Sequence, residues 1–444
     1  MPKLPKISGV ALLKWFARLY VRPLESLEKV VGTVGKVVSF DGGKYQKLHL
    51  VSDPAYIKHI LKTNKANYKR SPVIKALRPL LGNGIFISED QEWQSQRSHL
   101  KPSFHEHVIL QFESTIQEEC DILCNDWKHT PGIRDVEADM EMLMLRILVR
   151  TQFCDGIEVD YKEIHRAHNE VLSQTSIRNH KIKFYANRFR KFVGFSTSVT
   201  PQSTAVTYLD TVARHIIAFA RNNRKKCSYW LNDMFDRHVD EAEIRDQILN
   251  FIFAGYDTTA SALTWTLYCL ATNTVNQNEC RQEAQNTQST FANLSKLQIT
   301  KQCFQESIRL YPPVWSIHRQ SMAKDDIESQ PFDAQTYFMI CAYTLHRDPD
   351  YWVSPADFKP ERFSSENMRG KAFQYIPFGQ GERVCIGQSL AIMESQLIVS
   401  NLLREFRFAY NQSKPPQITP GIIMKTRSGL LLDVAPISLN TDGM

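Results

Sequence analysis

One cysteine of this chain stands in a loop whose residue types suit a metal-binding thiolate. The run from Phe378 to Gly387 reads FGQGERVCIG and places Arg383 two residues before Cys385. Iron prefers an anionic sulfur, so such a loop must stabilise negative charge through backbone N–H groups and a nearby cation. Gly381 and Gly387 permit the tight backbone, and Arg383 can reach a carboxylate of the bound group. The loop therefore predicts a haem-thiolate site, whereas a buried structural cysteine is the better interpretation of the other eight cysteines.

The spacing Phe-x-x-Gly-x-Arg-x-Cys-x-Gly, met here by Phe378, Gly381, Arg383, Cys385 and Gly387, resembles that of the cytochrome P-450 family. The resemblance implies a mainly α fold with a smaller β portion. It also implies that haem b lies between a dioxygen-activating helix and the helix of the Cys loop. No linker or repeat divides the chain, so we expect residues 1–444 to form a single haem domain.

An acid and a base three residues apart form the second candidate feature. Glu306 and Arg309 share one face of a predicted helix and can form an ion pair, although such pairs are also common on solvated helices. Arg362, in the run PERF, lies between this pair and the Cys loop. The resemblance implies that these three residues form a buried structural triad that fixes the Cys loop. Removal of one member would then leave an uncompensated buried charge.

The third feature is the run FAGYDTT from Phe253 to Thr259, inside an apolar stretch with helical periodicity. Gly255 weakens a helix there, and Thr258 can bond back to the carbonyl four residues earlier, so we expect a kink or widened turn. The resemblance assigns Asp257 and Thr258 as the acid–alcohol pair that delivers protons to dioxygen. An ordinary solvent-facing Asp–Thr pair is the alternative.

Carboxylates of a haem require cations or N–H donors. Trp93 and Arg97 lie four apart on one predicted helical face, where an indole N–H and a guanidinium can both donate to a carboxylate. Arg319, after the Pro312-Pro313 break, resembles the family's third propionate arginine, and a surface arginine on a strand is the rival interpretation.

By resemblance, the substrate pocket is lined by a mostly apolar set of residues, which favours a lipophilic or aromatic substrate: Phe251, Ala254, Val314, Trp315, Ile317 and Ile423. A basic segment from Arg178 to Lys191, interleaved with aromatic residues, could contact an anionic substrate, a carrier protein or a membrane. A solvated basic helix face is the favoured interpretation of that segment.

Cysteine usage and the first apolar segment predict the cellular compartment and the relation to a membrane. Nine cysteines without a C-x-x-C pair predict free thiols in a reducing compartment. The first apolar segment is interrupted by Lys14, Arg18 and Arg22, so it predicts a helix packed on the body rather than a transmembrane anchor. The chain then looks like a soluble, cytoplasmic, bacterial-type member that acts as a monomer and binds no nucleic acid.

Coarse patterning predicts strands between Val34 and Val51, a helix from Pro54, and mainly helices as far as Arg309. It further predicts a mixed segment from Val314 to Ala342 and a long helix from Gln388 to Phe406. The tail from Ile422 to Val434 alternates like a hairpin, and the Asn- and Gln-rich stretch from Asn273 to Gln302 reads as a surface connection.

Together these features predict a haem-thiolate monooxygenase that inserts one oxygen atom of O₂ into its substrate. No flavin or nicotinamide fingerprint is present, so we expect electrons from a separate ferredoxin and ferredoxin reductase. One alternative is an oxidative phenol- or aryl-coupling enzyme of secondary metabolism. The other is a haem sensor or carrier, against which Asp257 and Thr258 argue because a sensor needs no proton relay.

Overall fold

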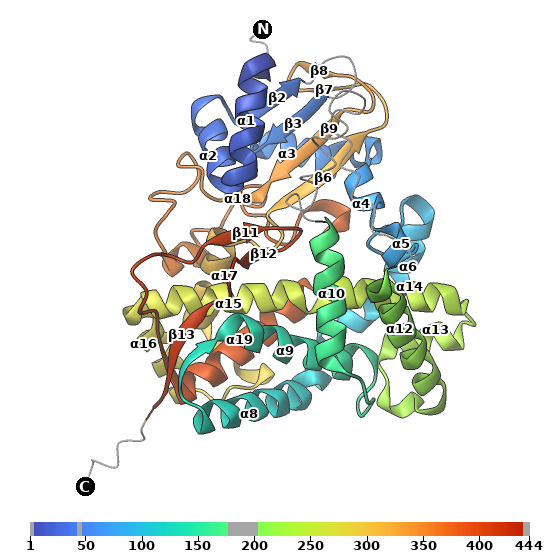
Figure 1. Cartoon of the computed structure of the whole chain (residues 1–444), viewed down its shortest axis with the longest axis vertical. Coiled ribbons are helices and arrows are strands. Elements are labelled where there is room, and N and C mark those ends of the chain that lie inside the picture. Colours follow the sequence, from blue (N-terminus) through green and yellow to red (C-terminus); the bar gives the residue numbers. More distant parts are fainter. Residues whose placement is uncertain (1–3, 42–46, 176–202, 438–444) are drawn as a thin grey trace.

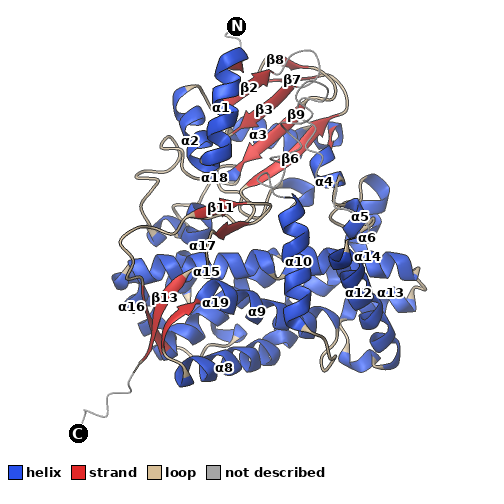
Figure 2. Ribbon diagram, viewed as in Figure 1, coloured by secondary structure: helices blue, strands red, loops and turns tan. Residues whose placement is uncertain are grey.

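The computed structural model describes residues 4–41, 47–175 and 203–437. The basic segment predicted from Arg178 to Lys191 lies outside these residues. Figure 2 shows a helix-rich region and a smaller β-rich region that contains both the N-terminal helices and the largest sheet. The fold is therefore mainly α with a smaller β portion.

Six strands form the largest sheet, in the order β1-β2-β3-β9-β6-β4 (Figure 1). β2 and β3 pair antiparallel in the segment predicted to be strand-rich, and β9 joins β3 in parallel. The last two strands of the order carry residues toward the site, because β6 includes Arg319 and pairs with β4. The strands of the structure are β1 Lys6–Ser8, β2 Val37–Asp41, β3 Lys47–Val51, β4 Tyr68–Arg70, β5 Gly132–Asp135, β6 Ser316–Ser321, β7 Asp325–Ile327, β8 Gln330–Phe332, β9 Tyr337–Cys341, β10 Phe406–Ala409, β11 Ile418–Pro420, β12 Met424–Thr426 and β13 Leu431–Pro436.

The helices surround one long central rod made of two of them, α14 and α15 (Figure 1). α15 packs against α9, α17 and α19. The α-helices are α1 Gly9–Val21, α2 Pro23–Thr33, α3 Pro54–Lys58, α4 Pro72–Lys75, α5 Arg78–Leu81, α6 Asp90–Leu100, α7 Glu106–Ile109, α8 Glu113–His129, α9 Val136–Leu148, α10 Tyr161–Thr175, α12 Thr204–Asn222, α13 Tyr229–Asp236, α14 Glu241–Gly255, α15 Asp257–Thr272, α16 Thr274–Asn286, α17 Gln298–Leu310, α18 Ala342–Leu345 and α19 Gln388–Glu405.

The central rod is interrupted where the sequence predicts a kink. α14 ends at Gly255 and α15 begins at Asp257, with Tyr256 between them. A Cβ on Gly255 would lie 2.6 Å from Leu148 Cδ1 of α9, so a larger residue would displace that leucine side chain. The long helix predicted after the Cys loop is also confirmed, as α19.

The first helix packs on the body, as predicted. Leu12 and Trp15 of α1 are buried, and the Trp15 ring stacks on Phe40 of β2 with centroids 4.0 Å apart. Among the described residues, no helix is both long and apolar enough to cross a membrane.

Two predictions of local structure are wrong. The stretch from Asn273 to Gln302 contains a regular helix, α16, before the connection to α17. The tail does not form one hairpin, because β12 pairs with β11 whereas β13 pairs with β10 and β5. Alternation identified extended segments in the tail, but it carries no information about which strand is the partner.

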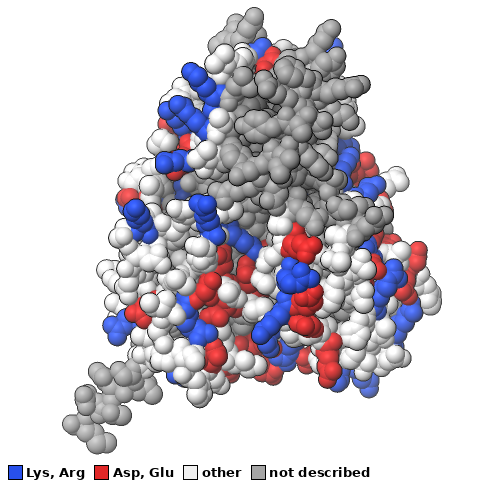
Figure 3. Space-filling model, viewed as in Figure 1, with Lys and Arg blue, Asp and Glu red and all other residues white. Residues whose placement is uncertain are grey.

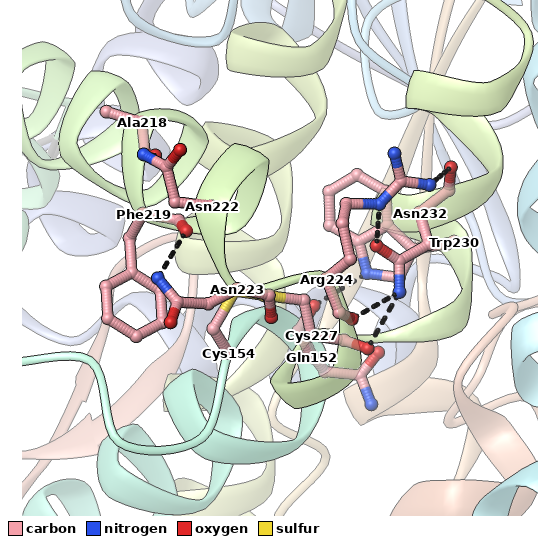
Figure 4. The surroundings of a disulfide bond; sticks show 10 residues. All are labelled: Gln152, Cys154, Ala218, Phe219, Asn222, Asn223, Arg224, Cys227, Trp230 and Asn232. Atoms are coloured by element: carbon pink, nitrogen blue, oxygen red, sulfur yellow. Dashed lines mark hydrogen bonds between the residues drawn. A yellow bond between two sulfur atoms is a disulfide. The ribbon is translucent and has the colours of Figure 1, made fainter.

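The prediction that all nine cysteines are free thiols is also wrong. Cys154 and Cys227 form a disulfide, although 73 residues separate them in sequence (Figure 4). An isolated antiparallel bridge between the two residues brings their backbones together, and local spacing cannot reveal such a contact. Beside the disulfide, the Trp230 indole donates to the Gln152 carbonyl over 2.7 Å (Figure 4). The other seven cysteines are free, so the count of cysteines no longer argues for a reducing compartment.

Candidate active site

Cys385 lies in a tight loop that leads directly into α19. Its backbone N–H donates to the Phe378 carbonyl over 2.9 Å, which closes the loop. Gly381 has φ +79°, and a Cβ there would lie 2.0 Å from the Leu61 carbonyl oxygen. No other residue type fits that position without moving the backbone. Gly387, two residues after the cysteine, caps the N-terminus of α19.

Opposing effects act on the Cys385 thiol. Burial raises the pKa of the thiol, while the Gly387 N–H and the Arg97 guanidinium act in the opposite direction. The positive end of α19 adds to these two effects. The side chain is nevertheless open to a large cavity. A thiol that faces an internal space, with a backbone N–H and a guanidinium beside it, has the donor chemistry that haem iron requires.

The cavity has a volume of about 440 Å³, and its wall is mostly apolar. All six predicted substrate-pocket residues lie on this wall: Phe251, Ala254, Val314, Trp315, Ile317 and Ile423. Thr258 of α15 also lines it, whereas Asp257 does not. The structure thus brings the cysteine, the threonine and the predicted pocket together around one space.

Four arginines converge on the cavity near the Cys loop: Arg70, Arg97, Arg319 and Arg383. Burial lowers the pKa of each of them, and that of Arg319 falls to about 10. Mutual repulsion contributes, since Arg383 lowers the pKa of both Arg70 and Arg319.

Two nitrogen atoms of this cluster, Arg70 Nε and Arg383 Nη1, are buried without a hydrogen-bond partner among the described residues. Glu89 raises the pKa of Arg70, Arg319 and Arg383, yet these two nitrogens have no acceptor, and the two carboxylates of a haem would supply it. The predicted donor Trp93 lies between two of these cations, with Arg383 4.4 Å and Arg97 5.6 Å from its ring centroid. Together with the thiol, the cluster fits haem as its ligand.

At the interruption of the central rod, Thr258 Oγ1 donates to the Ala254 carbonyl over 2.8 Å. Asp257 points away from the cavity and is fully buried. Its carboxylate oxygen Oδ1 lies 2.7 Å from Lys425 Nζ, in an ion pair that the sequence did not predict. The acid and the alcohol thus lie on different faces of α15, directly after the helix break.

Glu306, Arg309 and Arg362 lie together beneath the Cys loop. Arg309 donates twice to the Glu306 carboxylate, over 2.6 and 2.8 Å, and both side chains are fully buried. Arg362 Nε reaches the same carboxylate over 3.2 Å. Arg309 also donates to the His346 carbonyl, and His346 Nε2 accepts from the Ile376 N–H, which leads into the Cys loop.

Sequence reasoning missed several polar residues of the site. Glu394 of α19 lines the cavity, and burial raises the pKa of its carboxyl to about 8 against a hydrogen bond from Thr259. Arg70, Lys425 and Glu394 belong to no spaced motif in this chain. Arg70 and Lys425 are distinguished by their burial among charges and Glu394 by its burial in the cavity wall, and each of these observations requires the fold.

The comparisons with known proteins agree with this geometry. A family model described as cytochrome P450 matches residues 2–433. Cytochrome P450 4F5 of Rattus norvegicus is 27% identical over 88% of this chain and 80% of its own length. The ultra-long-chain fatty acid omega-hydroxylase of Homo sapiens is 25% identical over 93% of this chain and 84% of its own.

A crystal structure of CYP175A1 from Thermus thermophillus superimposes with a TM-score of 0.77 at 20% identity. It covers 97% of this chain and 99% of that one, which supports the fold alone. The two curated relatives named above are mammalian and this structural neighbour is bacterial, so bacterial origin stays a prediction. Because the family model spans nearly the whole chain and the cavity offers a thiol and four cations, the chain belongs to the cytochrome P450 family, the haem b monooxygenases.

Proposed function

We propose that this protein is a haem-thiolate monooxygenase for a lipophilic substrate, in which one haem domain over residues 1–444 performs the oxidation. The observation that carries the proposal is the placement of Cys385 and Thr258 on the wall of one apolar cavity. The bound haem would supply the one-electron and dioxygen chemistry. Cys385 would hold the iron, and Trp93 with Arg70, Arg97, Arg319 and Arg383 would hold the carboxylates.

The proposed proton relay consists of Thr258 and Asp257. The Thr258 hydroxyl donates its hydrogen bond to the Ala254 carbonyl. Its lone pairs therefore remain available to accept a hydrogen bond or a proton from the cavity. To donate into the cavity it must release that carbonyl, which lies across the break between α14 and α15. Asp257 lies behind the break, where it can hold a proton for Thr258 while the apolar wall excludes water.

The apolar lining of the cavity supports the proposal of a lipophilic substrate, which can be aliphatic or aromatic. The fatty acid hydroxylase among the relatives supports the aliphatic choice. Binding spectra with panels of fatty acids, terpenes, steroids and phenols would identify the class. The soluble cytoplasmic setting and the place in secondary metabolism stay predictions of the sequence.

Thr258→Ala and Asp257→Asn test the relay. Each variant is expected to retain haem and bind substrate, yet to lower product per electron pair roughly tenfold while hydrogen peroxide rises, because general acid catalysis is lost. Product yield, peroxide and electron consumption are measured together. Thr264→Ala is the matched control, since Thr264 makes the same backbone bond on α15, to Ala260, without lining the cavity.

The same experiment separates the alternative functions through the product. A product heavier than substrate by one oxygen atom from ¹⁸O-labelled O₂ supports the monooxygenase. A dehydrogenated dimer without new oxygen would instead identify the coupling enzyme. Haem binding without turnover of any substrate class, with competent reductases supplied, would identify a sensor or carrier.

We further propose that electrons come from a ferredoxin and its reductase. On the face shown in Figure 3, basic and acidic side chains are interspersed over the helical region, so docking depends on a local patch. Lys101 and Arg369 are exposed, and Lys371 lies 4.9 Å from the Trp352 ring centroid. The resemblance places all three on the face behind Cys385.

Charge reversal tests this docking face. Lys101→Glu combined with Lys371→Glu is expected to raise the apparent KM for an acidic ferredoxin roughly fivefold at low salt, and the effect should shrink as salt screens the charges. Steady-state reduction rates at several ferredoxin concentrations give the KM. Lys29→Glu, an exposed lysine of α2, is the control. Unchanged KM in the double variant would assign docking to another face.

A further inference from the structure

Lys425 of β12 lies between two buried carboxylates that come from different helices. Its Nζ is 2.7 Å from Asp257 Oδ1 on α15 and 2.6 Å from Glu141 Oε1 on α9. A third contact joins the same nitrogen to Asn169 Oδ1 over 3.1 Å. Asp257 is inaccessible to solvent, whereas the Lys425 side chain is 20% exposed. The ammonium therefore connects the buried acid of the proposed relay to the protein's exterior.

The charges around this ammonium do not balance. The titratable groups that face it come from α9, from α10 and from the start of α15: Glu137, Glu141, His165, His168 and Asp257. Tyr256, directly before α15, lies behind them, with its hydroxyl 2.8 Å from His168 Nδ1. Burial lowers the pKa of both histidines, that of His168 to about 4, so both are neutral at pH 7. Glu137 accepts hydrogen bonds from the backbone N–H and the hydroxyl of Thr426 and does not contact the lysine. The single positive charge of Lys425 therefore contacts two carboxylates, those of Asp257 and Glu141.

Glu141 is the carboxyl that relieves this imbalance. Burial, together with the charge of Asp257, raises its pKa to about 7 despite the opposing effect of Lys425. Its second oxygen lies 3.3 Å from His165 Nε2, and His165 is 22% exposed. Burial alone would lower the pKa of Lys425, but Asp257 and Glu141 offset it and leave that pKa above its ordinary value. Lys425 keeps its charge, and the mobile proton belongs to Glu141.

The hairpin that carries Lys425 also forms part of the substrate cavity. Residues 420–423, from the end of β11 to the residue before β12, line it. Ser261 of α15 donates to the Met424 carbonyl over 2.6 Å, and the Trp315 indole donates to the Gly421 carbonyl over 2.8 Å. The segment that contacts substrate is therefore held against the helix that carries the relay acid.

We propose that Lys425 is a positioning residue for Asp257 and that Glu141, which shares the same ammonium, resupplies the relay with protons. The inference rests on the proposed role of Asp257. In each cycle a proton leaves the Glu141 carboxyl and arrives on the Asp257 carboxylate, and Glu141 takes its replacement from solvent beside His165. Lys425 neither gains nor loses a proton and holds the two carboxylates within reach of each other.

Variants of Lys425 test the positioning role. Lys425→Met is expected to lower product per electron pair roughly tenfold, as expected for Asp257→Asn, because the acid loses the cation that fixes it. Lys425→Arg retains the charge and should restore most of the yield. Thr426→Val is the matched control, since it loses the contact with Glu137 in the same hairpin and leaves Lys425 in place. Its yield should equal that of the unaltered protein.

The pH profile tests the role of Glu141. Glu141 donates only when protonated, so yield should fall as pH rises through about 7, the raised pKa of this carboxyl. Lys425→Met removes the cation that opposes this rise, and the fall should move by about one pH unit or more toward alkaline pH. Glu141→Gln keeps a hydrogen-bond partner for Lys425 but removes the ionisable group. It should lower the yield at pH 6 and abolish the fall.

A readout that needs no turnover is carboxyl infrared absorption at pH 8. Relative to the unaltered protein, Lys425→Met should gain one protonated carboxyl band, because two buried carboxylates without a cation retain a proton. The band should disappear in the double variant with Glu141→Gln. The Glu394 carboxyl gives the same infrared band in both proteins, so that band cancels in the difference spectrum.

The outcomes separate this inference from the proposed function. If Asp257→Asn lowers the yield while Lys425→Met leaves both yield and pH profile unchanged, the inference is wrong and the relay stands. If Asp257→Asn leaves the yield unchanged, the relay and the inference both fall. Should Lys425→Met not retain haem, Glu141→Gln decides the matter, and an unaltered pH profile in that variant overturns the proposal.

Discussion

Replacing Cys385 with alanine is expected to abolish the red-shifted Soret band that thiolate-bound haem gives with carbon monoxide in the reduced state. The Cys loop offers one sulfur to the cavity, held by the Phe378 carbonyl and the N-terminus of α19. Without it, no anionic ligand faces the site from the loop, and haem content should also fall. Cys385→His should retain some haem but move the band, because imidazole is neutral and donates less electron density than a thiolate. Spectra of reduced, carbon monoxide-treated protein measure both effects.

The matched control for this experiment is Cys124→Ala. Cys124 is a free cysteine of α8, buried far from the loop in sequence, and burial raises the pKa of its thiol to about 12. Unlike Cys385 it does not line the cavity, so its replacement should leave the band in place. Survival of the band in Cys385→Ala would assign the ligand to another cysteine and remove the basis of the proposed site.

Those parts of the fold that depend on local spacing were accessible from the sequence. Apolar residues of regular period predicted α19, and the strand-rich segment before Pro54 became β2 and β3. Glycine and threonine close together in sequence predicted the break between α14 and α15, because both act on the backbone of their own helix. Such features need no knowledge of distant neighbours.

The wrong prediction for the stretch from Asn273 to Gln302 shows where that reasoning stops. The buried face of α16 consists of Gln277, Cys280 and Ala284, so a glutamine occupies a position where periodicity expects an apolar residue. Gln277 is buried because its amide bonds three backbone groups, including the carbonyl and N–H of Phe408. Phe408 lies 131 residues away, and a polar residue satisfied by tertiary contacts resembles a surface residue in the sequence.

The candidate site divides in the same way. Cys385, Arg383 and Thr258 were accessible because each belongs to a motif of fixed spacing. Lys425 became visible only when the fold placed it between Asp257 and Glu141, from three separate elements. Long-range ion pairs of this kind leave no periodic trace, so residues that tune a site are harder to predict than residues that form it.

A second large effect is expected beneath the Cys loop, where Glu306→Ala should yield protein that is poorly folded or fails to retain haem. The change removes the carboxylate that accepts from both Arg309 and Arg362 and from the Lys359 N–H. Arg309 would remain fully buried with an uncompensated charge, which costs about 3–5 kcal/mol of folding free energy. A loss of that size is a large fraction of the stability of an ordinary domain.

The effect should reach the haem site through a defined series of contacts. Arg309 donates to the His346 carbonyl over 2.7 Å, and the His346 ring accepts from the Ile376 N–H over 2.9 Å. Ile376 lies two residues before Phe378, whose carbonyl closes the loop around Cys385. Displacement of Arg309 therefore loosens the support of the ligand loop even in molecules that remain folded.

The control is an exposed pair of the same spacing. Glu163 and Arg166 of α10 lie three residues apart and form an ion pair at 2.6 Å, with Arg166 54% exposed. An exposed pair contributes little to stability because water screens it, so Glu163→Ala should retain full haem content and an unchanged urea midpoint. Arg362→Ala removes the outermost member of the triad but leaves the Glu306–Arg309 pair intact. Its haem content and stability should therefore lie between those of Glu306→Ala and Glu163→Ala. Normal haem content and stability in Glu306→Ala would show that the pair does not support the Cys loop, and the structural role assigned to the triad would fail.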